Sequence, residues 1–433
     1  MQIDSRCNFS PSNATGQQCI SAEEMGAVYG SQHTLAHSVC YYRDLFGLFV
    51  RSWSMTMRSL SFFQPALELL QDNLDILPAV GGAVEDLLRP DVDELEDALV
   101  NAESREVTEF LETPTPDLRN LYRPTPPLYR PQKHHYRFFI DGSLRTYYLA
   151  TGIEGNRSFP IELAQIGAAV MQRDDRGTVR PLAARQRILL LLPRGPLGVS
   201  DTVWAQLQRL DTANGAFEVI DTTEKNAMTP AEATAESLRT RAGGIARNRM
   251  HKLEIKVIDR TDGLRNDDTW LILDGAVKLD EFIKTPHMIG VAKNFRKDPE
   301  FRFGRGGSKR LDISKILAGL PYASRTAAFS AHGGQVAFWY VRLREQKELD
   351  YPLMGVVKVE LPRPDRTPVT AELADLLSRT LVAERNVTPH GRDNRWHCHL
   401  YPIFLAEQAI KNGFYSKDVL MGMIRWPRPA SIA

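Results

Sequence analysis

The stretch FFIDGS, residues 138–143, places an acid and a glycine directly after an apolar run. An acid–glycine pair between two strand-like runs is typical of a hairpin turn. We therefore expect HYRFFID (135–141) to pair with LRTYYLATGI (144–153) across Gly142–Ser143. The alternative is that Asp141 ends a strand and points its carboxylate toward a metal ion. On this stretch alone the turn is favoured, and the rest of the chain decides between the two.

Length and composition indicate a globular protein with a large core. The 433 residues are enough for two or three domains, or for one large domain with additions, and 43% are hydrophobic and 25% charged. No apolar run reaches about 18 residues, which predicts no membrane span. The first residues show no secretory signal. The four cysteines are scattered, as expected of reduced thiols in the cytoplasm: Cys7, Cys19, Cys40 and Cys398.

Charge is distributed unevenly along the chain, although the formal net charge is only +1. Residues 84–112 are strongly acidic and residues 293–310 are strongly basic. A basic block in a near-neutral protein can follow a nucleic-acid backbone, because phosphates attract clustered Lys and Arg. A solvated loop explains the same block equally well.

A proline-rich segment divides the chain into two regions of different character. Residues 20–112 have apolar positions at three- and four-residue spacing, which predicts mostly helix. Residues 114–131 are too rich in proline for a helix or a central strand. We therefore expect a helical N-terminal region (1–113), a linker (114–131) and a second domain (132–433), which carries the motifs described below.

The region after the linker predicts a mixed α/β sheet flanked by helices, because an opening run of strands gives way to strands that alternate with helices. Further strands are expected at 164–174, 185–193, 269–277, 287–295, 335–343 and 353–361. Helices are expected at 200–215, 229–259, 369–384 and 402–412.

Three acids in this region could form a metal site. LILDGAV places Asp274 and Gly275 after a second apolar run, and the helix before it carries Glu254 at the border of its apolar face. Carboxylates are the ligands that Mg²⁺ and Mn²⁺ prefer, and two such ions can support hydrolysis of a phosphodiester. Two turns and a surface glutamate are the alternative explanation of Asp141, Asp274 and Glu254.

The order of these motifs resembles the NurA nuclease family. FFIDGS, HKLEIKV, LILDGAV with IGVAKNF, GVVKVELP and YPIFLAEQAIK follow one another across roughly 135–412. The resemblance implies an RNase H-like fold, a Mn²⁺ (or Mg²⁺) cofactor and a homodimer that processes DNA ends with a HerA-like hexameric ATPase. It also implies that Asp141, Glu254 and Asp274 bind metal, and that Lys293 contacts the scissile phosphate.

The last motif departs from the family pattern. The family has a tyrosine–proline stretch followed by an alanine–histidine pair, whereas Tyr401–Pro402 is followed here by Glu407 at the histidine position. If the register is fixed on that helix, His399 takes the place of the tyrosine. Glu407 could bind a metal ion or orient water, and it could equally weaken catalysis. The pair His397 and His399 is interpreted as packing rather than as a separate metal site.

The glycine-rich stretch FGRGGSKR (303–310) lacks the Gly-Lys-Ser/Thr order of an ATP-binding loop. It is predicted to contact DNA phosphates without sequence preference. The residues expected to do so are Arg302, Arg305, Lys309 and Arg310.

The sequence therefore predicts a metal-dependent DNA nuclease that works with a HerA-like ATPase in DNA end processing or in defence against phage. Residues 1–113 are expected to dock the partner or to dimerise. A catalytically weak subunit that clamps DNA or regulates the ATPase is the alternative, and the change at Glu407 favours it. No residue decides between repair and defence.

Overall fold

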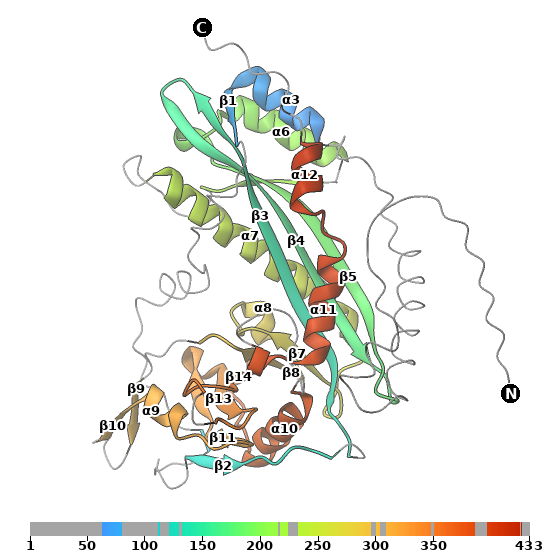
Figure 1. Cartoon of the computed structure of the whole chain (residues 1–433), viewed down its shortest axis with the longest axis vertical. Helices are drawn as coiled ribbons and strands as arrows, with labels where there is room; N and C mark the ends of the chain where they lie inside the picture. The colour runs from blue at the N-terminus through green and yellow to red at the C-terminus, as the bar shows by residue number, and fades with distance from the viewer. Residues whose placement is uncertain are drawn as a thin grey trace, which may run out of the picture. The chain divides into compact units, whose positions relative to one another are not determined.

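The computed structural model describes residues 63–79, 111–112, 121–129, 132–214, 217–223, 233–295, 300–303, 309–347, 350–385, 396–424 and 426. The chain divides into two compact units, Met1–Ser59 and Leu60–Ala433, and every described residue belongs to the second. This unit is a mixed α/β structure with a large mixed sheet flanked by helices, which confirms the predicted class (Figure 1).

The main sheet of the described residues has the strand order β2-β11-β13-β14-β8-β7-β3-β4-β5-β6, with β1 added to β3 and β12 to β13. The pairs β3–β7, β7–β8 and β5–β6 are parallel, and the other pairs are antiparallel. The strands are β1 Asp75–Pro78, β2 Tyr122–Pro124, β3 Tyr136–Glu154, β4 Arg157–Arg173, β5 Val179–Leu192, β6 Glu218–Asp221, β7 Trp270–Asp274, β8 Met288–Ala292, β11 Ser324–Thr326, β12 Phe329–Ala331, β13 Val336–Arg342 and β14 Val356–Pro362. A separate hairpin pairs β9 (Glu300–Phe303) with β10 (Lys309–Asp312).

The helices cover both faces of this sheet. They are α3 Gln64–Asn73, α6 Asp201–Asn214, α7 Ala235–Ile258, α8 Asp280–Ile283, α9 Ile313–Ala318, α10 Ala371–Glu384, α11 Tyr401–Lys411 and α12 Lys417–Met423. α7 packs on β3, β4 and β5 from one face, and α11 packs on the same three strands from the other (Figure 1). Strand β4 is buried almost throughout for this reason.

The expected turn at Gly142–Ser143 is wrong. β3 runs without interruption through both residues for 19 residues, and β4 pairs with it across this point, at Asp141↔Ala169 and Gly142↔Ala168. The chain instead reverses after Glu154, where Gly155 has a φ of +62° that favours glycine. The long antiparallel ladder with β4 holds the acid–glycine pair in an extended conformation that its local turn preference alone does not predict.

Most other predicted elements are confirmed, and two differ. The expected helices 200–215, 229–259, 369–384 and 402–412 correspond to α6, α7, α10 and α11. β1 is a strand inside the region predicted as mostly helical, because it adds to the edge of β3. β2 lies inside the proline-rich segment as a three-residue edge strand, where a proline costs no ladder hydrogen bond. Within the described part of the chain, no helix is long and apolar enough to cross a membrane.

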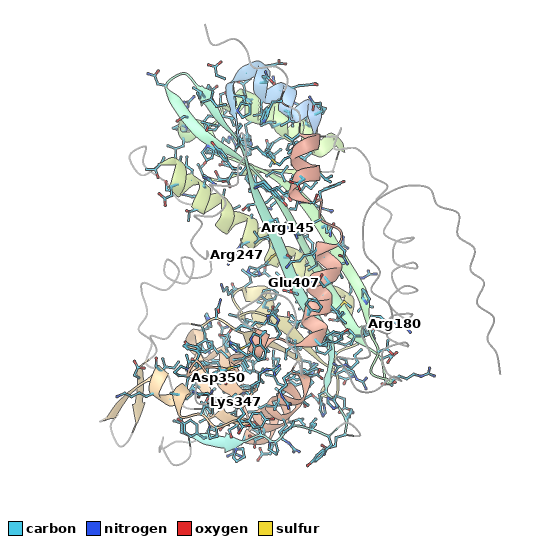
Figure 2. The ribbon with its side chains drawn as sticks, viewed as in Figure 1. Arg145, Arg180, Arg247, Lys347, Asp350 and Glu407 are labelled. Atoms are coloured by element: carbon cyan, nitrogen blue, oxygen red, sulfur yellow. The ribbon has the colours of Figure 1, made fainter. Side chains whose placement is uncertain are left out.

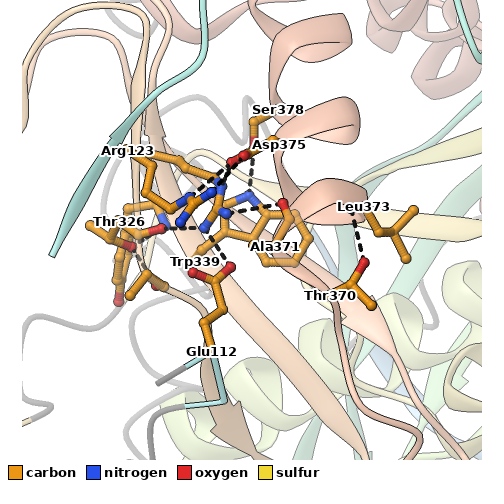
Figure 3. A network of polar contacts seen from close by, with 12 residues as sticks. Glu112, Arg123, Thr326, Trp339, Thr370, Ala371, Leu373, Asp375 and Ser378 are labelled. Atoms are coloured by element: carbon orange, nitrogen blue, oxygen red, sulfur yellow. Dashed lines mark hydrogen bonds and ion pairs between the residues drawn. The ribbon is translucent and has the colours of Figure 1, made fainter. Parts of the chain in front are cut away.

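A buried network of ion pairs fixes β2 and β11 to α10 (Figure 3). Arg325 on β11 is fully buried and pairs with Glu112 at 2.7 Å and with Asp375 on α10 at 2.6 Å. Arg123 on β2 pairs with the other oxygen of Asp375 at 3.0 Å. Because Arg325 is removed from water, Glu112 depends on it for compensation of its charge, whereas Asp375 also has Arg123.

Replacing this arginine tests how much the network contributes. Arg325→Met leaves Glu112 and Asp375 without their shared partner, so we expect the free energy of unfolding to fall by about 3–5 kcal/mol. Urea denaturation measures the change. Lys133→Ala, which removes the exposed pair with Asp268, is the control and should leave the urea midpoint almost unchanged. Equal effects of the two substitutions would contradict a structural role for the buried network.

Candidate metal centre

Asp141 lies in the middle of β3 and faces α11. Phe139 packs in the core that contains Ile403 and Ala406 of α11, whereas Ile140 packs in the core that contains Leu253 of α7. Side chains alternate along a strand, so Asp141 shares the α11 face with Phe139, and position 142 faces α7. The continuous strand therefore gives Asp141 a position inside the fold rather than at a turn.

Asp274 and Lys293 share this face. Ile272 on β7 and Val291 on β8 pack in the same core as Phe139, so the alternation places Asp274, two residues after Ile272, and Lys293, two residues after Val291, on the same side. The Lys293 Nζ donates a hydrogen bond of 2.8 Å to the Asp274 Oδ2. An acid and a lysine from the ends of two neighbouring parallel strands thus lie in contact.

Glu407 approaches the same face from α11, the helix that packs across β3 and β4 (Figure 2). Its neighbours Ile403 and Ala406 are buried against the sheet, and Glu407 itself is partly exposed. Lys411, one turn later, forms an ion pair with it. The residue that stands at the family's histidine position therefore belongs to the same local group as Asp141 and Asp274.

Glu254 reaches the centre from the opposite face. It is buried on α7, and its Oε1 lies where a side chain at Gly142 would be, because a Cβ there would stand 2.5 Å from that oxygen. The second oxygen, Oε2, is hydrogen-bonded to the His251 Nδ1 at 2.7 Å. The absent side chain at Gly142 is what allows this carboxylate to approach the backbone of β3.

Electrostatics connects the four acids. Burial raises the pKa of the Asp141 carboxyl well above its ordinary value, and the charges of Asp274, Glu407 and Glu254 raise it further, whereas the charge of Lys293 lowers it. The carboxyl is consequently held in its protonated form at a pH where an exposed aspartate is charged. A carboxyl group with a strongly raised pKa among other carboxylates is typical of a functional site.

Next to Asp141, one side of β3 lacks a partner strand among the described residues. The β3–β7 ladder ends at Ile140↔Leu273, and β1 pairs with β3 only from Ala150 onward. Between these points, no strand among the described residues pairs with this side of β3. Ligands of open α/β sheets bind beyond the carboxyl ends of parallel strands, which is where Asp141 and Asp274 lie.

The donor set suits a hard divalent cation, although its members are engaged with one another. Carboxylate oxygens are what Mg²⁺ and Mn²⁺ prefer. In the described part of the chain, however, no three His, Cys, Asp or Glu side chains are arranged as ligands of one ion. Three of the four acids hold internal cationic or hydrogen-bonding partners: Asp274 holds Lys293, Glu407 holds Lys411, and Glu254 holds His251.

The other predicted catalytic residues lie at or before the start of α11. Tyr401 is its first residue and is 45% exposed, and His399 precedes it. Glu407 follows Tyr401 by six positions, which corresponds to about 9 Å of helix. The charges that act most on Asp141 come from Asp274, Lys293, Glu407 and Glu254 rather than from this end of the helix. The His397 Nδ1 accepts a hydrogen bond from the Gly355 N–H, which supports the packing interpretation of the histidine pair.

The residues predicted to bind DNA lie on the separate β9–β10 hairpin. Arg310 is opposite Arg302, and Lys309 is opposite Phe303. Arg305 and the side chains of this hairpin lie outside the described part of the structure.

Two supporting residues were not predicted. His251 could have been found, because residues three positions apart on a helix are neighbours and Glu254 follows it at that spacing. Glu360 on β14 is buried, accepts a hydrogen bond of 2.7 Å from the Val277 N–H and pairs with Lys358 at 2.5 Å. It holds the segment that follows Asp274, and only the tertiary structure reveals that contact.

Comparisons with known proteins give no family. The chain matches no family model, and no curated protein is significantly similar to it.

Neutralising Asp141 should stabilise the metal-free protein. Because its folded pKa is raised, the folded state keeps a proton that the unfolded chain releases above about pH 4, so the stability contribution of this group is lost as pH rises from there. Asp141→Asn removes this loss, and we expect about 1 kcal/mol more stability at pH 7 in the presence of a chelator. Added Mn²⁺ should raise the melting temperature of the unmodified protein and not that of the variant. If Asp141→Asn is less stable than the unmodified protein in the chelator, the neighbouring acids do not destabilise the charged form of Asp141 and the interpretation is contradicted.

Filling the space at Gly142 should displace Glu254. In Gly142→Ala the new Cβ meets the Glu254 Oε1 at 2.5 Å and Met250 at 3.0 Å, so we expect a loss of about 1–3 kcal/mol in unfolding free energy. Gly243→Ala on α7 is the matched control, because a Cβ there meets nothing within 4 Å. Its higher helix propensity should stabilise the protein by up to about 1 kcal/mol. Thermal denaturation compares the two, and equal stability would contradict the close approach.

Proposed function

We propose that this protein is a metal-dependent DNA nuclease of the NurA type, with an RNase H-like arrangement of its central strands. One observation carries the proposal: Asp141, Asp274, Lys293 and Glu407 come from four separate elements to one face of the sheet, and the pKa of Asp141 responds to all of them and to Glu254. A buried carboxyl group with a raised pKa beside several other carboxylates is a candidate functional site. The order of the motifs along the chain, which resembles the NurA family, supports the same activity.

Asp141, Asp274 and Glu407, with Glu254 from the opposite face, are the residues that would hold Mn²⁺ or Mg²⁺. When bound, the ions would supply Lewis-acid stabilisation of charge on the phosphate. Lys293 would give up its hydrogen bond to Asp274 and direct its ammonium group toward a phosphate oxygen. His251 would keep Glu254 in place, since a carboxylate ligand needs a fixed orientation to bind metal well. Asp141 would release its proton when a cation binds.

The proposed partner is a HerA-like hexameric ATPase that acts with a homodimer of this chain in the cytoplasm. Hydrolysis along a DNA strand requires movement of the strand, and the sequence contains no ATP-binding loop of the Gly-Lys-Ser/Thr type. The proposed setting is DNA end processing or defence against phage. Residues 1–113 remain the region proposed for docking or dimerisation.

A DNA-clamping or regulatory subunit that does not cut is the second candidate. The observation that favours it is that Lys293 and Lys411 satisfy Asp274 and Glu407 from within the chain. In such a subunit the acids would position these lysines, and the partner ATPase would be the only enzyme of the pair.

Digestion of linear DNA with Mn²⁺ separates the two functions. We expect the unmodified chain to cut, and Asp141→Asn and Asp274→Asn each to lower the rate by more than about 100-fold, because even outer-shell partners of metal ligands contribute about 10–100-fold. Both variants should still bind DNA. Asp268→Asn, at an exposed pair with Lys133, is the control and should cut normally. Absence of cutting by every form, with the partner ATPase present, would refute the nuclease and support the clamp.

A further inference from the structure

A cationic site lies at the beginning of α11, away from the acids. We call it the arginine–aromatic surface: Tyr322, Arg344, Arg385 and Trp396. The Arg385 guanidinium lies over the Tyr322 ring, 5.8 Å from its centroid, and the Arg344 guanidinium lies over the Trp396 ring at 4.9 Å. Tyr322 is 38% exposed, and the other three side chains are partly exposed. The surface therefore presents stacked cationic and aromatic groups to solvent.

The positive charge of this surface is not neutralised within the described residues. Burial lowers the pKa of Arg344, and the nearby charge of Arg385 lowers it further. In the part of the chain that the structure describes, neither guanidinium forms an ion pair. Arg344 donates from Nε to the His397 carbonyl at 3.1 Å, and Arg385 donates from Nη1 to the Val382 carbonyl at 2.8 Å. Two like charges held side by side create a demand for an anion.

Three other arginines stacked on aromatic rings differ in this respect, whereas Arg145, over Phe414, forms no ion pair in the described part of the chain either. Arg194 lies over Trp204 and pairs with Asp201 at 2.7 Å. Arg173 and Arg239, which stack on Phe139 and Tyr148, likewise pair with glutamates. Stacking therefore does not by itself leave an arginine uncompensated in this protein. The Nη2 of Arg344 also has no hydrogen-bond partner among the described residues.

The surface is continuous with the helix that carries Glu407. Arg385, at the end of α10, forms a β-bridge with Leu400, which is the N-cap of α11. The N-terminus of α11 lies here, and the positive end of its helix dipole adds potential at the same place. An anion bound here would lie at one end of α11, and Glu407 lies nearly two turns farther along.

We propose that the arginine–aromatic surface binds an unpaired nucleic-acid strand, with phosphates at Arg385 and Arg344 and a base stacked on the exposed ring of Tyr322. A duplex keeps its bases stacked inside and offers no ring to Tyr322, whereas an unpaired strand offers both phosphates and bases. The inference takes DNA as its ligand from the proposed function, but it does not depend on any cutting. It gives the strand a place to be held beside the proposed centre.

Binding of a fluorescent 20-nucleotide oligothymidylate to the full chain, measured by anisotropy in EDTA, tests the proposal. Arg385→Glu should raise the dissociation constant about tenfold or more, because it removes a phosphate contact and adds repulsion. Tyr322→Ala should raise it about tenfold through loss of stacking. Arg385→Lys should retain most of the affinity. Arg194→Glu is the matched control at a stacked arginine that already has a carboxylate partner, and it should bind as the unmodified chain does.

Further measurements determine whether the proposal stands. Circular dichroism should show the same melting profile for all variants, so that lost binding is not lost folding; Arg385→Gln replaces Arg385→Glu if the latter unfolds. Tyr322→Ala should leave the affinity for a DNA duplex of equal length unchanged. The proposal would be overturned if Arg385→Glu and Tyr322→Ala bind oligothymidylate as tightly as the unmodified chain. It would equally be overturned if these substitutions weakened only the binding of polyglutamate, an anionic polymer without bases. The assay is run without metal and requires no cutting, so a protein that binds here but never cuts would refute the nuclease and leave this inference intact.

Discussion

The centre depends on one constraint, the uninterrupted passage of β3 through Asp141 and Gly142. Because successive side chains of a strand face opposite sides, this pair sends a carboxylate to the α11 face and leaves an empty position on the α7 face. Glu254 occupies that empty position. A turn at the same residues would have carried both to the surface, and neither helix could have reached them. The acid and the glycine thus have separate roles on the two faces.

The burial of Asp141 and Glu254 has a cost that packing alone does not explain. A buried carboxyl group next to other carboxylates favours the protonated form, and the raised pKa of Asp141 reflects this. Lys293 relieves part of the repulsion through its bond to Asp274. At Arg325, by contrast, two carboxylates meet a fully buried arginine, so that network has its own cation. Three of the four acids hold a lysine or a histidine of their own, and Asp141 lies buried among them with a raised pKa, which distinguishes the centre from the Arg325 network.

The sequence predicts the sheet and most helices because their apolar periodicities are long. It identifies Asp141 and Asp274 because each follows an apolar run, although only Asp274 ends its strand in the structure, and Lys293 comes from the family resemblance. It fails at Gly142, where the acid–glycine pair has a local preference for turns and only the distant partner strand β4 overrides it. It also cannot predict that Glu254 approaches from the opposite face, because that depends on the packing of α7 over the strand. The contact of Glu360 with the Val277 N–H joins residues that are 83 positions apart.

Where the NurA resemblance implies a histidine, the chain has Glu407, and this changes the charge of the centre as well as its shape. Histidine would bring at most a positive charge, whereas Glu407 brings a negative one that raises the pKa of Asp141 together with Asp274 and Glu254. A more negative site attracts divalent cations more strongly and holds an approaching phosphate less well unless a cation is present. In the proposed nuclease, this added negative charge would make the centre more dependent on metal, and it would make separate cationic groups for the phosphate backbone, such as Arg385 at the other end of α11, more necessary.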